Sequence, residues 1–187
     1  MFYSRRPTEM KHMTKTQNVT TYASICMILL RELRTERGVH QAQVADWIGK
    51  TPSAWTKVEA GKSPLQFETF VRVCFSFQVQ PSAVMATAER YSALLRQHNW
   101  AVLTTELDLN EDGLLHCAQE YWASPGFRNA LPYQWGAPSV LNGPLYNLDN
   151  TITLALSIRF ALDENFRKMQ LLPTIPPLPP LNTLPLK

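Results

Sequence analysis

The sequence has little charge, few cysteines and no long apolar run, and each shortage excludes a class of protein. Charged residues make up 18% of the chain, fewer than in an average soluble protein. The three cysteines (Cys26, Cys74 and Cys117) are odd in number and scattered, so they form neither a disulfide framework nor a Cys-x-x-Cys zinc motif. No apolar run reaches the roughly 18 residues of a membrane-spanning helix. We therefore expect a cytoplasmic protein with buried thiols, without a metal site and without membrane segments.

Known catalytic motifs are also absent from the sequence. None of the four histidines belongs to a His-x-x-x-His pair, and the chain has no glycine-rich phosphate loop or nucleophile elbow. After residue 99, Lys168 is the one lysine before the C-terminal residue, which gives little basis for a serine–lysine peptidase. His116 and Cys117 lie close in sequence to Asp112 and Glu120, but any short helix can hold such a group by chance. We expect no enzyme activity and no cofactor.

Charge is distributed unevenly along the 187 residues, whose net charge is +3. The first 98 residues carry thirteen basic and seven acidic side chains, whereas the remaining 89 carry five basic and eight acidic ones. The front of the chain is thus +6 and the back −3. A basic segment suits a polyanion such as DNA. The acidic back half would be repelled by DNA and is expected to face away from it.

The most informative pattern lies in residues 39–62, which read as two short helices joined by a tight turn. Residues 41–48 have apolar side chains at helical spacing, and Gly49 then ends the first helix, where a positive φ is tolerated. Thr51 is a good N-cap and Pro52 suits the first helical position, so a second helix begins there and stops at Gly61. This arrangement predicts a helix-turn-helix unit, whose second helix enters a DNA groove.

Three further helices are expected around this unit. Residues 23–37 carry an apolar stripe that ends at Gly38, residues 67–75 have helical spacing, and a fifth helix is expected from Ser82 to about Gln97. Residues 1–22 are polar and basic without periodicity. They are expected to be a flexible arm, either a disordered leader or a segment that follows DNA phosphates or the minor groove.

Residues 24–87 resemble a Cro/C1-type (XRE-family) helix-turn-helix domain. The family pattern has a Gln at the start of the second helix, then Leu-Ala, Leu-Gly, a central Ile in the recognition helix, and Ile-Glu-x-Gly-Lys. The corresponding residues here, without a gap, are Gln41, Val44-Ala45, Ile48-Gly49, Trp55 and Val58-Glu59-Ala60-Gly61-Lys62. The resemblance implies a mainly α, five-helix, lambda-repressor-like DNA-binding domain over residues 23–98.

The resemblance also implies which side chains meet DNA. Gln41 would contact a phosphate from a helix N-terminus, although simple capping is the alternative. The expected groove-facing residues are Thr51, Pro52, Ser53, Thr56 and Lys57, and the expected phosphate contacts are Arg31, Arg37, Lys50 and Lys62. Many relatives have Gln, Arg or Asn at the first two helical positions, where this chain has Pro52 and Ser53. We therefore expect modest direct base readout and more dependence on phosphates and DNA shape.

Three other residues of the motif have expected structural roles. Arg34 precedes Gly38 by four residues, where the family often keeps an Arg that pairs with the Glu of Ile-Glu-x-Gly. The resemblance thus implies an Arg34–Glu59 ion pair that fixes the first helix to the third. Trp55 takes the core Ile position, whereas Trp47 falls on the outer side of its helix. Trp47 either packs on a neighbouring loop or anchors an interface.

The remainder of the chain matches no family pattern. Residues 99–170 mix apolar segments with repeated Pro and Gly breaks and are expected to form a small α+β dimerisation or sensor region. Residues 151–162 alternate apolar and polar side chains, which predicts a half-buried strand paired with residues 100–109 or with another subunit. A helix is the competing interpretation. Residues 171–187 hold six prolines and are expected to be a Pro-rich tail, either unstructured or docked on a partner subunit.

Together these features predict a cytoplasmic, sequence-specific transcriptional regulator, a repressor, of a bacterium, phage or mobile element. We expect it to bind double-stranded DNA as a homodimer on a palindromic operator. The region after residue 99 would bind a protein partner or a small ligand. The alternatives are an antitoxin that binds a toxin through this region and represses its own operon, or an architectural DNA-binding protein.

Overall fold

The computed structural model describes residues 18–129, 138–173 and 183–185 of the chain. Five helices make up its N-terminal half, namely α1 (Tyr22–Glu36), α2 (Gln41–Trp47), α3 (Pro52–Glu59), α4 (Phe67–Ser76) and α5 (Pro81–Gln97). The predicted five-helix, mainly α domain is therefore confirmed, and each helix begins within a few residues of the position that the sequence indicated.

The C-terminal part combines short helices with small sheets. Its helical elements are α6 (Gly113–Ala123), α7 (Pro125–Arg128), the 3-10 turn η1 (Val140–Asn142), α8 (Leu156–Leu162) and α9 (Glu164–Leu171). Its strands are β2 (Ala101–Leu103), β3 (Leu145–Tyr146), β4 (Thr151–Thr153) and β5 (Thr183–Pro185). The expectation of a small α+β region after the helical domain is confirmed.

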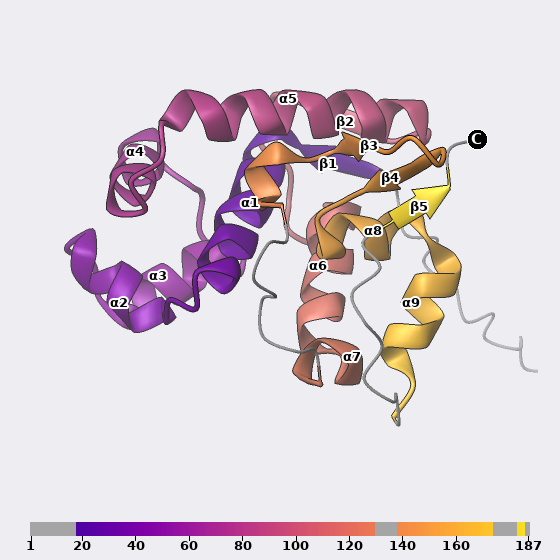
Figure 1. Ribbon diagram of the computed structural model, residues 1–187. Helices are drawn as coiled ribbons and strands as arrows, with labels where there is room; N and C mark the ends of the chain where they lie inside the picture. The colour runs from indigo at the N-terminus through magenta and orange to yellow at the C-terminus, as the bar shows by residue number, and fades with distance from the viewer. Residues whose placement is uncertain (1–17, 130–137, 174–182, 186–187) are drawn as a thin grey trace, which may run out of the picture.

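Helix α1 lies between the two parts of the molecule. In Figure 1, α2, α3 and α4 gather at one end, α5 runs along the top, and α6 to α9 occupy the other end, with α1 in the middle. Helix α1 contacts α5 on one side and α6 on another. All six residues from Ile25 to Leu30 are buried, because a helix that is covered on several sides has no polar face over that stretch. One hydrophobic core consequently runs across the predicted domain boundary at residue 98.

The N-terminal arm ends earlier than expected. Val19–Thr21 form the strand β1, which pairs in parallel with β2 and aligns Val19 with Ala101 and Thr21 with Leu103. Thr21 also caps α1, since its hydroxyl accepts a hydrogen bond from the Ser24 N–H at 3.0 Å. The prediction that the flexible arm extends to residue 22 is therefore wrong for residues 18–22, and residues 1–17 lie outside the described part of the chain.

The predicted long strand over residues 151–162 is wrong for most of its length. Residues 151–153 do form β4, but the chain then turns into α8 at Leu156. Ser157, Ile158, Arg159 and Phe160 are four successive buried residues, so α8 is covered on several sides and its apolar positions carry no helical period. The helical alternative holds here, because Leu, Ala and Arg are good helix formers and tertiary packing decides the outcome.

The strand partners also differ from those expected. β4 pairs antiparallel with β3, through Ile152 and Tyr146, and with β5 on its other edge. The expected partner, the segment 100–109, instead pairs with β1. Since β5 comes from the Pro-rich tail, the prediction of an unstructured or partner-docked tail is wrong at residues 183–185, which pair within the same chain. Residues 174–182, 186 and 187 lie outside the described part.

The cysteines are buried and unlinked. Cys26, Cys74 and Cys117 are all free thiols in the core. Burial raises the pKa of Cys26 to about 12 and that of Cys74 to about 11, so both stay protonated at neutral pH. None of the described helices is long and apolar enough to cross a membrane. The described residues also contain no group of three or more His, Cys, Asp or Glu side chains suited to a metal ion.

At Gly61 the end of α3 lies close against α6 of the C-terminal part. Its φ is +71°, and a Cβ atom at this position would lie 2.2 Å from Cδ2 of the buried Leu115 on α6. Gly49 has a similar φ of +67°, but a Cβ atom there would have no other atom within 4 Å. Substitution of Gly49 tests the loss of stability from backbone strain alone, whereas substitution of Gly61 tests strain together with steric crowding.

We predict that Gly61→Ala lowers the free energy of unfolding by about 2–4 kcal/mol, because it adds overpacking against Leu115 to the backbone strain. Gly49→Ala introduces the backbone strain alone and should cost about 1 kcal/mol. Urea denaturation of both variants measures the difference. Equal losses would show that α6 does not press on Gly61 in solution.

Candidate nucleic-acid interface

The turn between α2 and α3 is fixed by backbone hydrogen bonds. Gly49 donates to the Asp46 carbonyl at 3.1 Å and Lys50 donates to the Ala45 carbonyl at 2.9 Å, which closes the C-terminus of α2. The φ of +67° at Gly49 permits this reversal, as the sequence predicted. The turn sets α3 at an angle to α2, which is the arrangement of a helix-turn-helix unit.

Helix α3 has one buried and one exposed face. Thr51 caps it by accepting a hydrogen bond from the Ala54 N–H at 3.2 Å, and Pro52 occupies its first turn. Its buried residues are Trp55, Val58 and Glu59, which confirms Trp55 as a core residue. All five side chains predicted to face a DNA groove are exposed: Thr51, Pro52, Ser53, Thr56 and Lys57.

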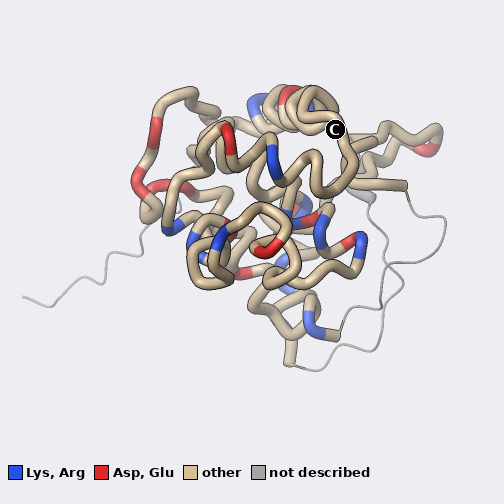
Figure 2. The backbone as a smooth tube through the Cα atoms, turned by 90° about the vertical axis from the view of Figure 1, so that its left-hand side faces the viewer, with Lys and Arg blue, Asp and Glu red and all other residues tan. Residues whose placement is uncertain are grey.

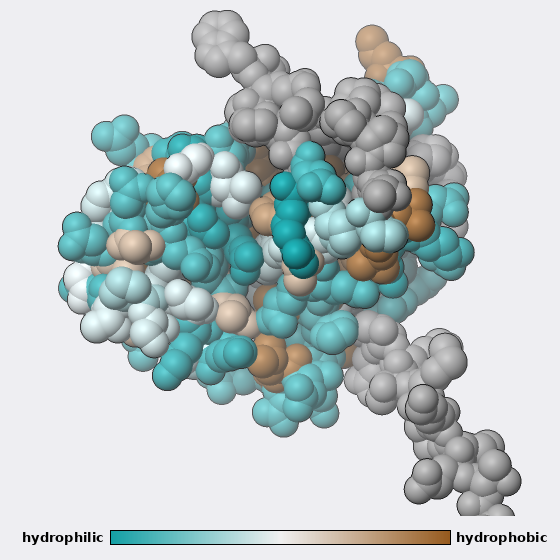
Figure 3. Space-filling model, turned by 90° about the horizontal axis from the view of Figure 1, so that it is seen from below, coloured by the Kyte–Doolittle hydropathy of each residue, from teal (hydrophilic) through white to brown (hydrophobic). Residues whose placement is uncertain are grey.

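The surface around α3 is polar but not strongly basic. Lys62 is exposed and Lys50 half-buried, and Asp46 on α2 is an exposed acid. Figure 2, in which this end of the molecule faces the viewer, shows basic and acidic residues interspersed rather than in a continuous basic stripe. Seen from below in Figure 3, the end that holds α2 and α3 is mostly hydrophilic, with small apolar spots. A groove-facing surface of this kind supplies hydrogen bonds and a few positive charges.

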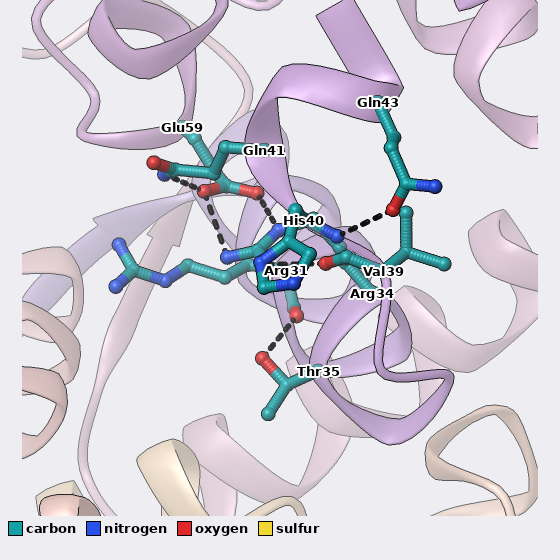
Figure 4. A network of polar contacts seen from close by, with 8 residues as sticks. All are labelled: Arg31, Arg34, Thr35, Val39, His40, Gln41, Gln43 and Glu59. Atoms are coloured by element: carbon teal, nitrogen blue, oxygen red, sulfur yellow. Dashed lines mark hydrogen bonds and ion pairs between the residues drawn. The ribbon is translucent and has the colours of Figure 1, made fainter.

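The predicted ion pair between Arg34 and Glu59 is present and bidentate (Figure 4). Arg34 Nε lies 2.6 Å from Glu59 Oε1, and its second terminal nitrogen lies 3.1 Å from Oε2. The remaining nitrogen donates to the Val39 carbonyl at 2.8 Å, in the turn between α1 and α2. Because the Glu59 side chain is 0% exposed and that of Arg34 13%, water cannot replace either partner.

Gln41 belongs to the same network. Its side-chain amide donates to Glu59 Oε2, so the side chain points into the molecule between α2 and α3 (Figure 4). A phosphate at the N-terminus of α2 would therefore meet free backbone N–H groups before it met this side chain. Two neighbours that the sequence interpretation missed, His40 and Gln43, are exposed there, and the His40 N–H donates to Gln43 Oε1 at 3.2 Å. Both residues could have been identified from the sequence, because they lie at the first turn of the predicted helix.

Two of the arginines predicted to contact phosphates have partners within the chain. The Arg31 guanidinium lies 3.7 Å from the centre of the Trp122 ring on α6, and burial lowers its pKa from the ordinary value. Arg37 donates to the Phe77 carbonyl at the end of α4. Trp47, half exposed, packs edge to face on that same Phe77, with ring centres 6.1 Å apart. Arg31 thus joins α1 to the C-terminal part, whereas the exposed Arg37 stays at the molecular surface.

The C-terminal part contacts the far end of α3. The Gln119 side chain on α6 donates to the Ala60 carbonyl just after α3, and Leu115 packs on Gly61. These contacts satisfy the C-terminal end of α3 and leave its N-terminal end open. The end of α3 that carries Pro52 and Ser53 is therefore the accessible one.

Comparison with known proteins identifies one feature of the chain. A family model described as a helix-turn-helix domain matches residues 28–84. No curated protein and no solved structure matches the chain. The matched segment contains α2, α3, α4 and the Arg34–Glu59 pair, which supports a helix-turn-helix domain over residues 28–84. The match does not distinguish the Cro/C1 type from other helix-turn-helix domains.

We predict that Glu59→Gln lowers the free energy of unfolding by about 2–4 kcal/mol, because it leaves the Arg34 charge largely buried without a counter-charge. The matched control is Glu68→Gln, since Glu68 pairs with Arg72 on the exposed surface of α4 with side chains 76% and 57% exposed. That change should cost less than about 0.5 kcal/mol. Urea denaturation compares the two variants, and similar small losses would contradict the structural role of Glu59.

Proposed function

We propose that this protein is a sequence-specific transcriptional regulator that inserts the N-terminal end of α3 into the major groove of double-stranded DNA. The observation that carries the proposal is the two-faced character of α3. Trp55, Val58 and Glu59 anchor it in the core, whereas its groove-facing side chains are exposed. A helix held so firmly by one face presents the other face in a fixed orientation.

The exposed side chains define how bases are read. Ser53 and Thr56 each offer one hydroxyl, Pro52 offers an apolar surface to a thymine methyl group, and Lys57 can reach a guanine or a phosphate. Pro52, Ser53 and Thr56 cannot make the bidentate contacts that Arg, Asn or Gln makes, so Lys57 is the one residue of this set that can bind two acceptors of a guanine. Specificity for a DNA sequence therefore depends on phosphate contacts, on DNA shape and on the spacing of two half-sites.

A homodimer on a palindromic operator supplies the missing specificity. Two copies with equivalent α3 helices in successive major grooves would read half-sites about 34 Å apart. The acidic C-terminal part packs behind α1, so it is available for contact between copies. A repressor is the simplest form of such a regulator, because occlusion of a promoter needs DNA binding alone. We place it in the cytoplasm of a bacterium, or on a phage or mobile element, from its resemblance to Cro/C1-type domains.

An antitoxin that also represses its own operon is a second candidate function. Tyr146 in β3 and Leu148 in the turn after it are exposed apolar side chains, at 59% and 107%, and favour contact with a protein partner. In that case a small toxin encoded next to this protein should bind the C-terminal part and leave α3 free. Co-purification with the neighbouring gene product separates this candidate from a regulator that acts alone.

We predict that selection from random DNA yields a consensus with two-fold symmetry, and that the double change Ser53→Ala and Lys57→Ala lowers affinity for it by about 10- to 100-fold. Because Lys57 contacts DNA, the slope of log affinity against log salt should fall by about one. Fluorescence anisotropy at several salt concentrations measures both quantities.

Lys168→Ala is the matched control for this experiment. Lys168 is an exposed lysine on α9 that pairs with Glu164, far along the chain from α3. It should leave both affinity and salt slope unchanged. No enrichment of a consensus, or equal binding by the double variant and the natural protein, would refute groove reading by α3.

A further inference from the structure

A cavity of about 540 Å³ lies between α1 and the C-terminal part, away from the exposed face of α3. Its walls come from the C-terminal half of α1, from α5, α6 and α7, and from the segments on either side of β3 and β4. Its acidic and basic residues are Glu32, Glu36 and Arg37, and its aromatic residues are Tyr91, Tyr121 and Phe127. The volume suits a small organic ligand.

Glu32 brings a carboxylate to this cavity and forms no ion pair among the described residues, although the Arg31 guanidinium is close enough to interact with it electrostatically. One of its oxygens accepts hydrogen bonds from the indole of Trp122 at 3.4 Å and from the Ser157 N–H at 3.3 Å. Both donors are neutral, so they satisfy hydrogen bonds at the N-terminus of α8 without cancelling the negative charge. Burial accordingly raises the pKa of Glu32 above its ordinary value.

Glu36 is a second carboxylate one helical turn further along α1. Its Oε2 accepts from the Val140 N–H at 2.8 Å and from the Ser139 hydroxyl at 3.2 Å, again from neutral donors. Residues i and i+4 lie on the same helix face, so the two carboxylates reinforce each other's negative potential. Neither takes part in any of the ion pairs found among the described residues.

The nearby arginines have other partners. Arg31 stacks on Trp122, and Arg37 donates to the Phe77 carbonyl. Arg90 on α5 donates to the carbonyls of Leu141 and Gly143 at 2.7 Å and 3.1 Å. Arg37 lines the cavity, whereas Arg31 and Arg90 do not. None of the three guanidinium groups forms an ion pair with Glu32 or Glu36 in the described part of the chain.

Aromatic side chains supply the rest of the cavity surface. Tyr121 and Phe127 meet edge to face with ring centres 5.3 Å apart. Tyr91, which also lines the cavity, accepts a hydrogen bond from the Ala155 N–H at 2.8 Å through its hydroxyl, and this bond fixes its ring. Aromatic rings attract cations through their negative faces and also bind apolar groups.

We propose that this cavity is a binding site for a small organic cation, an ammonium group on an apolar body. The ammonium would lie against Glu32 and Glu36, and the apolar body against Tyr121 and Phe127. An anion would be repelled by the two carboxylates, and a neutral ligand would leave their charges uncompensated. This proposal does not depend on the proposed DNA-binding function. The cavity and the helix-turn-helix both involve α1, but Arg34 lies on a different face of that helix.

The test uses three probes of nearly the same size, in free protein without DNA. Phenethylamine is cationic, 2-phenylethanol is neutral and phenylacetate is anionic at neutral pH. We expect phenethylamine to cause saturable shifts in the amide NMR signals of Gly38, Gly143 and Ala155, which line the cavity, with a dissociation constant of about 1 mM or lower. 2-Phenylethanol should bind at least about tenfold more weakly, and phenylacetate should not bind.

Variants identify the residues responsible. Glu32→Gln and Glu36→Gln should each weaken phenethylamine binding by about tenfold and leave the affinity of 2-phenylethanol unchanged. Glu120→Gln, a change at an exposed glutamate on α6 outside the cavity, should have no effect. Dispersion of the same NMR spectra reports folding, and Glu36→Gln decides the matter if Glu32→Gln disrupts the cap of α8.

Three results would overturn the proposal. The first is equal affinity for the amine and the alcohol, and the second is amine binding that neither glutamine variant weakens. The third is the absence of saturable shifts with phenethylamine up to about 20 mM, well above the affinity expected for a ligand of this size. Each result is obtained without DNA and therefore leaves the regulator proposal standing or failing by its own test.

Discussion

The buried carboxylate of Glu59 is the constraint on which the helix-turn-helix arrangement depends. A charge with no access to water is costly unless several donors surround it. Arg34 on α1 supplies two of these donors and Gln41 on α2 supplies a third, while Arg34 also binds the carbonyl of Val39. Four successive parts of the chain are thereby joined at one point, so α3 cannot tilt relative to α1 without breaking the network. The orientation in which α3 presents its exposed face is therefore set from inside the protein.

Helix α1 extends this constraint to the rest of the molecule. Arg34 faces α3, whereas Arg31, Glu32 and Glu36 on the same helix contact Trp122, Ser157 and Val140 of the C-terminal part. The two halves thus share one helix and one hydrophobic core, without a linker between them. Any change in the C-terminal part that moves α1 would reach Arg34 within a single rigid element.

The helix-turn-helix could be predicted from local residue preferences. The rest of the fold depends on contacts between distant segments and could not. Gly49, Thr51 and Pro52 act through their own backbone preferences, so their roles follow from the sequence alone. Arg31 and Arg34 are the same residue type three positions apart, yet one stacks on Trp122 and the other pairs with Glu59. The position of Arg34 relative to Gly38 indicated its pair, whereas nothing near Arg31 in the sequence indicated its contact with Trp122. The strands β1 and β5 pair with distant segments over three residues each, which is too short for a periodic signal. The cavity with Glu32 and Glu36 could not be predicted either, because its walls come from segments over 100 residues apart in the sequence.

The contacts at the two ends of α3 bear on how the proposed regulator would select DNA with so few base-reading side chains. Its N-terminal end carries short side chains, which tolerate several bases when each contact is taken alone. Its C-terminal end is held by Gln119 and Leu115 of α6, and its middle by Glu59. A rigid helix with weak contacts discriminates through position, since it accepts only DNA whose groove width and phosphate spacing match it. In the proposed complex with DNA, the C-terminal part would therefore contribute to recognition by fixing where the end of α3 lies.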